Sequence, residues 1–167
     1  MQRLAFFLVF VTLGCVSSGR FEGGTYRAGD LELRTPEVPS SWRRIVLADA
    51  ILAFRDDRHA ASVLLNGRCG RRDDDTPLGV LTTHLLFGTT EREVLRQELM
   101  AFDGREALRT VVRAKLDGVP LQYELLVLKK NNCVYDFVFV ASPARFEEGA
   151  AVFRQFVGAI RTSRGAL

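Results

Sequence analysis

The fold class follows from residues 97–139, which read QELMAFDGREALRTVVRAKLDGVPLQYELLVLKKNNCVYDFVF. Two Asp-Gly dipeptides, at 103–104 and 117–118, divide this stretch. Asp-Gly favours a two-residue hairpin turn because both residues tolerate positive φ. Apolar and polar residues alternate between the turns, which is typical of strands with one buried face. The stretch therefore predicts an antiparallel meander of four strands.

The registers predicted from the three turns place apolar residues on the same face of the sheet. A slip of one residue in any of them would turn these side chains to solvent. A turn at Asp117-Gly118 sets four pairs opposite each other: Ala114 and Leu121, Val112 and Tyr123, Thr110 and Leu125, Leu108 and Val127. A turn at Asp103-Gly104 sets Leu99 opposite Leu108, and Glu98 opposite Arg109 on the other face. A loop of three residues, Lys130–Asn132, then sets Val127, Leu125 and Tyr123 opposite Tyr135, Phe137 and Phe139.

Earlier segments add strands and a helix. Apolar runs at 50–54 and 60–65 flank a polar turn and predict a strand pair. Thr76-Pro77 predicts a helix start, with proline at the first helical position and leucines at helical spacing behind it. Thr90-x-x-Glu93 then has the spacing of a capping box. It predicts a short second helical turn, and a strand entered directly from the loop is the equal alternative.

The C-terminal region predicts an amphipathic helix over Glu147–Ile160. Its apolar residues Phe153, Phe156, Val157 and Ile160 follow the i, i+3, i+4, i+7 pattern. We expect this aromatic stripe to cover the face of the sheet that carries Phe137 and Phe139. The predicted fold class is α+β: an antiparallel sheet with a C-terminal four-stranded meander, one helix after the first strand pair, and a long C-terminal helix packed on the sheet.

The N-terminus has the features of a secretory signal. Arg3 precedes an apolar run, Leu4–Leu13, that is too short to span a membrane. Thr12-Leu13-Gly14-Cys15 resembles the bacterial lipobox, with threonine at a position where that motif usually has leucine. The resemblance implies cleavage before Cys15 and acylation of that cysteine, so that several acyl chains hold the protein at a membrane. The alternative is an ordinary signal peptide with a chance cysteine.

These features predict the domain organisation. We expect a lipoprotein signal peptide at 1–14, the lipidated cysteine with a flexible tether at 15–30, a single α+β domain at 31–162 and a tail at 163–167. By the enterobacterial sorting rule, Val16 after the cysteine favours the outer membrane over the inner one. The predicted location is therefore the cell envelope, facing the periplasm.

Charge and cysteine content fit this address. Removal of residues 1–14 deletes only Arg3 among the charged residues, so the formal net charge falls from +3 to +2. So small a charge does not favour nucleic acid as a partner. Of the three cysteines, Cys15 is assigned to lipid. Cys69 and Cys133 are then a disulfide candidate in an oxidising compartment, with two buried free thiols as the alternative.

No residue pattern predicts catalysis. His59 and His84 are the two histidines, and a Gly-x-Ser-x-Gly nucleophile elbow is absent from the sequence. Isolated histidines do not make a zinc site. Asp73-Asp74-Asp75 lacks the EF-hand pattern and is expected to be a solvated loop before the helix. We therefore expect neither an enzyme nor a cofactor or metal site.

Basic residues form two candidate contact surfaces: a cluster of arginines around Cys69, and Arg109, Arg113 and Lys115 on the polar face of one strand. Arg68, Arg71 and Arg72 surround Cys69, and guanidinium groups suit carboxylate or phosphate partners. The cluster is a possible site for a partner's acidic patch or an anion. A charge-balanced surface is the alternative, because acidic residues are interspersed.

The order of elements, with the run Val134–Phe139 leading into an aromatic C-terminal helix, resembles the PsbP-like superfamily, which includes DcrB-like envelope lipoproteins. The resemblance covers residues 31–162 and implies an antiparallel sheet with helices on its faces and a non-catalytic role in binding other proteins. The expected function is a periplasm-facing accessory module of an envelope complex. The alternative is a carrier of a small hydrophobic ligand or lipid, with a pocket lined by Phe137, Phe139, Phe153 and Phe156.

Overall fold

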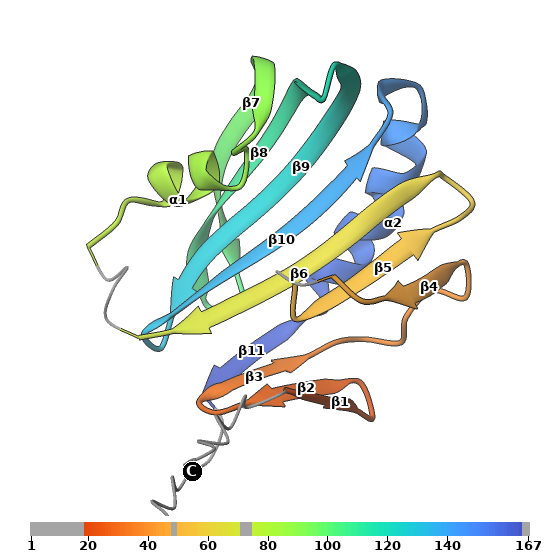
Figure 1. The fold of residues 1–167 in the computed structure, drawn as a ribbon. Helices are drawn as coiled ribbons and strands as arrows, with labels where there is room; N and C mark the ends of the chain where they lie inside the picture. The colour runs from red at the N-terminus through yellow and green to blue at the C-terminus, as the bar shows by residue number, and fades with distance from the viewer. Residues whose placement is uncertain (1–18, 48–49, 71–74, 165–167) are drawn as a thin grey trace, which may run out of the picture.

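A computed structural model describes residues 19–47, 50–70 and 75–164, and shows two antiparallel sheets and two α-helices (Figure 1). The larger sheet has the strand order β4-β5-β6-β10-β9-β8-β7. Its strands are β4 (Trp42–Ile45), β5 (Leu52–Asp56), β6 (Ala61–Cys69), β7 (Thr89–Phe102), β8 (Arg105–Leu116), β9 (Val119–Lys130) and β10 (Cys133–Ala141). The smaller sheet has the order β1-β2-β3-β11, with β1 (Arg20–Glu22), β2 (Thr25–Ala28), β3 (Leu31–Arg34) and β11 (Arg161–Arg164).

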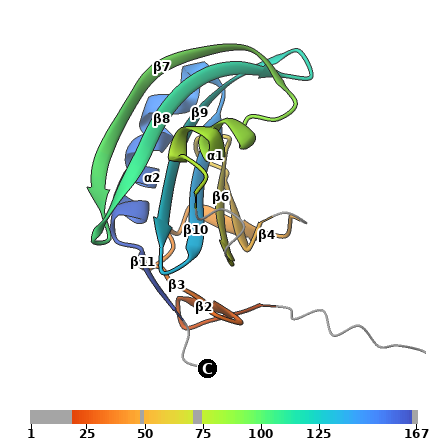
Figure 2. The same cartoon turned by 90° about the vertical axis from the view of Figure 1, so that its left-hand side faces the viewer.

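The two helices lie on opposite faces of the larger sheet (Figure 2). The short helix α1 (Leu78–His84) packs Leu81 against Val127 and Val134. A 3-10 turn, η2 (Pro143–Arg145), leads into the long helix α2 (Phe146–Gly158) on the other face. There Phe153 stacks on Phe139, with ring centroids 5.5 Å apart. The aromatic stripe of the C-terminal helix thus covers the face predicted for it.

Two of the three predicted registers are confirmed. The structure pairs Ala114 with Leu121 and Leu108 with Val127 across the Asp117-Gly118 turn. It also pairs Leu99 with Leu108, and Glu98 with Arg109, across the Asp103-Gly104 turn. Asp103 and Asp117 have φ values of 46° and 50°, as the two-residue turn requires.

The third register is wrong by one residue. The turn contains only Asn131 and Asn132, with φ values of 55° and 60°, because asparagine tolerates the left-handed conformation at both central positions. The partners of the predicted set are shifted accordingly: Val127 lies opposite Asp136, Leu125 opposite Val138 and Tyr123 opposite Val140. Tyr135, Phe137 and Phe139 therefore lie on the face of the sheet that α2 covers, where Phe139 contacts Phe153 of α2 and Tyr135 reaches Ser163 of β11. Val127, Leu125 and Tyr123 of β9 lie on the opposite face, which α1 and the residues after it cover. Both faces of β9 and β10 are therefore buried.

The other predicted elements are present with small changes. The early strand pair forms β5 and β6, and α1 begins directly after Pro77. Strand β7 begins at Thr89, so the strand alternative for this segment is correct and the capping-box helix is wrong.

The predicted tether and tail contain strands. Residues 20–28 form the hairpin β1–β2, which turns at Gly23-Gly24 with φ values of 56° and 72°. Glycine pairs favour such turns, and Tyr26 is buried in the main core. Strand β11 pairs with β3 and extends to Arg164, so the predicted tail overlaps a strand. Cys15 and the cleavage site lie outside the described residues. Within the described ranges, no helix has the length and apolar content needed to span a membrane.

Candidate functional site: a pocket beside α2 and the free edge of β7

The predicted cysteine pair lies where two strands meet. Cys69 ends β6 and Cys133 begins β10, and the two residues are direct partners in the sheet. The structure joins them in a disulfide over a sequence separation of 64 residues. This is the pairing that an oxidising compartment favours.

The predicted arginine cluster is only partly described. Arg71 and Arg72 lie outside the described residues. Arg68 forms an ion pair with Asp136, at 3.5 Å between Nη1 and Oδ2. Asp136 also accepts a hydrogen bond from Asn66. Burial raises the pKa of the Asp136 carboxyl, against the opposing effects of Asn66 and Arg68.

Each of the two histidines contacts a neighbouring side chain of the fold. His59 lies in the β5–β6 turn, and its Nδ1 is 2.6 Å from Oδ2 of the buried Asp56. The other carboxylate oxygen of Asp56 accepts the backbone N–H groups of Arg58 and His59, which fixes the turn. His84 ends α1 and lies 5.8 Å from the Phe87 ring. Within the described ranges, no group of three or more acidic, histidine or cysteine residues could hold a metal ion.

A pocket of about 290 Å³ lies between the C-terminal half of α2 and the strands β7, β8 and β9. Most of its wall is apolar, formed by Met100, Phe102, Leu126, Phe153 and Val157. Gly158 of α2 also lines the pocket, and a Cβ there would meet no atom within 4 Å. The remaining lining residues are charged: Glu98, Arg109, Glu124 and Arg154.

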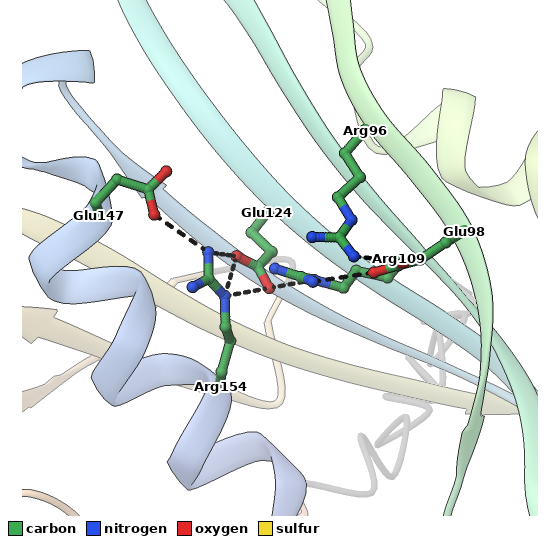
Figure 3. A network of polar contacts seen from close by, with 6 residues as sticks. All are labelled: Arg96, Glu98, Arg109, Glu124, Glu147 and Arg154. Atoms are coloured by element: carbon green, nitrogen blue, oxygen red, sulfur yellow. Dashed lines mark hydrogen bonds and ion pairs between the residues drawn. The ribbon is translucent and has the colours of Figure 1, made fainter.

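The charged residues belong to a network that bridges α2 and the sheet (Figure 3). Its centre is the carboxylate of Glu124 on β9, whose side chain is only 3% exposed. Arg109 on β8 donates its Nε–H to Oε1 of Glu124 at 2.7 Å. Arg154 on α2 donates to both oxygens, at 3.1 and 2.9 Å. One buried carboxylate is therefore shared by two arginines.

Three further residues, Arg96, Glu98 and Glu147, surround this inner group. Glu98 accepts hydrogen bonds from Arg109 at 3.0 Å and from Arg96 at 2.7 Å. Glu147 lies 3.5 Å from Arg154, and its side chain is 75% exposed. The hydrogen bond from Arg96 is the main cause that lowers the pKa of Glu98. The bond to Glu124 is the main cause that raises the pKa of Arg109.

The aromatic pocket expected from the sequence is filled. Phe137, Phe139, Phe153 and Phe156 are each at most 3% exposed, and they pack against one another and against neighbouring rings. Of these four, only Phe153 lines the pocket. The cavity lies against β7, β8 and β9, and not against β10, which carries Phe137 and Phe139.

The second candidate surface is the outer edge of β7. This strand ends the larger sheet, is 14 residues long and is exposed over most of its length. Val94 and Leu99 are each 58% exposed. From Arg96 to Phe102 the pairing with β8 is regular, whereas irregularities interrupt the pairing before Arg96. The opposite edge strand, β4, has four residues.

Comparisons with known proteins identify the fold. No family model and no curated protein sequence matches the chain. Among solved structures, cyanobacterial PsbP (CyanoP) from Synechocystis has a TM-score of 0.53 and 14% identity, over 86% of this chain and 97% of that chain. LpqN of Mycobacterium tuberculosis, described as involved in cell envelope biogenesis, has a TM-score of 0.54 and 12% identity, over 81% and 85%.

The Ran-binding protein Mog1p of Saccharomyces cerevisiae is similar at a TM-score of 0.52 and 10% identity, over 79% of this chain and 89% of that chain. The chain thus has the PsbP-like fold that the sequence resemblance implied. At these identities the likeness extends to the fold alone.

Sequence reasoning found one link of the network and missed the others. The facing pair Glu98 and Arg109 followed from the Asp103-Gly104 register. Glu124 and Arg154 are 30 residues apart, and their contact depends on how α2 is placed on the sheet. The signal for it in the sequence is Glu124 itself, a charged residue directly before the apolar run Leu125–Leu128.

Proposed function

We propose that this protein is a non-catalytic accessory lipoprotein of the cell envelope. Acyl chains on Cys15 hold it at a membrane, with the outer membrane favoured over the inner one, and its domain faces the periplasm. The signal-like N-terminus, the resemblance to the lipobox and the disulfide support this location. The fold likeness to LpqN, which is involved in cell envelope biogenesis, agrees with it.

The accessory role is to bind an extended segment of another envelope protein along the free edge of β7. The observation that carries this proposal is the length and exposure of that edge. Soluble proteins usually shorten, cover or bend their edge strands, because unpaired N–H and C=O groups attract other strands. Here the stretch 96–102 is regular and exposes Leu99 on one face. Such an edge suits strand addition, in which backbone hydrogen bonds give affinity and alternate side chains give specificity.

The test is site-specific photo-crosslinking in intact cells that produce the full chain. A benzophenone side chain replaces Leu99 or Ala101 on the β7 edge, or Val46, which is 93% exposed beside the opposite edge strand β4. We expect one discrete adduct, containing the same envelope protein, from both β7 positions and none from Val46.

Two results would overturn the proposed partner. An adduct of twice the chain mass would identify a second copy of the chain in place of another protein. Adducts of equal yield from Val46, or none from either β7 position, would show that the β7 edge binds no partner strand.

A carrier of a small hydrophobic ligand is the second candidate, and the pocket beside α2 favours it. Its volume is at the lower end for small-molecule sites, which are concave and mostly apolar with a few oriented polar groups. The four phenylalanines that the sequence predicted to line a cavity pack against one another and against neighbouring rings. The carrier function therefore depends on the pocket beside α2 alone.

A further inference from the structure

We propose that the pocket beside α2 binds a single-chain anionic amphiphile, of which a fatty acid is the simplest example. Its carboxylate would lie on Arg109 and Arg154, and its aliphatic chain along Met100, Phe102 and Leu126. This site is separate from the β7 edge, so the inference does not depend on the proposed partner.

The charge of the inner group favours an anion. Arg109 and Arg154 carry two positive charges, and Glu124 between them carries one negative charge. The inner three residues therefore have a net charge of +1 beside an apolar wall, and Glu98, which also lines the pocket and is paired with Arg109, brings the charge of the lining to zero until a ligand anion takes its place. Guanidinium groups present several donors in a fixed plane, which suits a carboxylate. Glu124 holds both arginines in place at the edge of the pocket.

The outer carboxylates occupy the positions that a ligand anion would take. Glu98 accepts a hydrogen bond from Arg109, Glu147 forms an ion pair with Arg154, and with Arg96 they bring the whole network to neutrality. Exposed ion pairs contribute little, typically below about 1 kcal/mol. Glu147 in particular can turn to solvent at small cost, because its side chain is 75% exposed and its contact is 3.5 Å long. A bound carboxylate would replace it.

The apolar wall selects the rest of the ligand. Five of its side chains are hydrocarbon or thioether groups: Met100, Phe102, Leu126, Phe153 and Val157. The open space beside Gly158 leaves room along the helix. A linear chain fits such a narrow apolar space, because methylene groups gain by leaving water.

Binding is tested by calorimetric titration of the purified mature domain with dodecanoate, below its micelle-forming concentration, and with the neutral analogue dodecanol. We expect dodecanoate to bind more tightly. Arg154→Gln should lower the affinity for dodecanoate roughly tenfold, in keeping with the loss of a charge-assisted hydrogen bond. It should change the affinity for dodecanol little. Glu147→Gln should strengthen dodecanoate by about two- to threefold, since it removes a competing carboxylate.

Two leucine variants of α2 test the position of the chain. Gly158→Leu adds a bulky side chain at a residue that lines the pocket and should weaken the binding of both ligands. Ala151→Leu, exposed on the same helix and outside the pocket lining, should weaken the binding of neither. Equal affinity for dodecanoate and dodecanol would overturn the anion preference. No binding, or no difference between the two leucine variants, would overturn the site. Glu147→Gln keeps the proposal testable if Arg154→Gln fails to fold, because Glu147 is exposed.

Discussion

Asp103 connects three parts of the chain through one carboxylate. It begins the β7–β8 turn, and its Oδ2 accepts the backbone N–H and the hydroxyl of Thr162, both at 2.7 Å. The same oxygen accepts a hydrogen bond from Lys130 at 2.8 Å. Burial by itself raises the pKa of Asp103, but the bonds from Lys130 and Thr162 outweigh this effect, and the pKa lies below its ordinary value. The folded state therefore favours the ionised form.

This pKa predicts how stability depends on pH. A carboxyl whose pKa is lower in the folded state stabilises the fold above its unfolded pKa, near 4, and that stability is lost as the pH falls through the lower folded pKa. Asp103→Asn should lower the free energy of unfolding by roughly 2 kcal/mol at pH 7, and the difference from the parent should shrink below pH 4. Urea titrations at pH 7 and pH 3 measure this difference in the free energy of unfolding.

Asp117→Asn, at the same turn position with an exposed side chain, is the control and should change stability by under about 0.5 kcal/mol. A difference that stays constant down to pH 3 would contradict the assignment.

At the scale of elements, the sequence predicts contacts that follow from local turn chemistry. Asp-Gly pairs determined two registers correctly. The predicted turn Lys130–Asn132 is one residue longer than the observed turn Asn131-Asn132, because asparagine is compatible with turns of several lengths. This difference of one residue reverses which residues of β10 lie on each face of the sheet, and it changes the strand partners of Tyr135 and Phe137. Local alternation could not reveal the error, since β9 and β10 are buried on both faces and carry apolar residues on both.

The disulfide between β6 and β10 closes the longest loop that the sequence predicted. Replacing Cys69 and Cys133 together by alanine should lower the free energy of unfolding by up to roughly 4 kcal/mol, because the bridge restricts a loop of 64 residues in the unfolded chain. Urea unfolding of the double variant and of the parent measures the loss. The parent after reduction should resemble the double variant. If the oxidised parent and the variant unfold at the same urea concentration, the bridge contributes no stability in solution.

At the scale of the whole molecule, the smaller sheet is what sequence reasoning missed. It joins the two ends of the described chain, because β11 pairs with β3 and β3 pairs with the hairpin β1–β2. Such pairing between distant segments leaves no local pattern, apart from the Gly23-Gly24 turn. The consequence concerns the proposed anchor. Strand β1 begins at Arg20, only five residues after Cys15. Five extended residues reach at most about 18 Å, so an acylated Cys15 would hold the smaller sheet close to the membrane surface.

Acylation of Cys15 determines whether the smaller sheet is held close to a membrane. The intact mass of membrane-extracted protein should correspond to residues 15–167 with acyl groups added, and alkylating reagents should modify Cys69 and Cys133 only after reduction. Cys15→Ser should leave the chain unacylated and release it from the membrane fraction, because the acyl chains supply the attachment. Its fold, followed by circular dichroism, should be unchanged, since Cys15 precedes β1. A full-length, unacylated parent with freely alkylated thiols would contradict the envelope location, and with it the choice of envelope proteins as partners of β7. The pocket beside α2 would be unaffected, because its lining begins at Glu98 and its ligand is tested on the isolated domain.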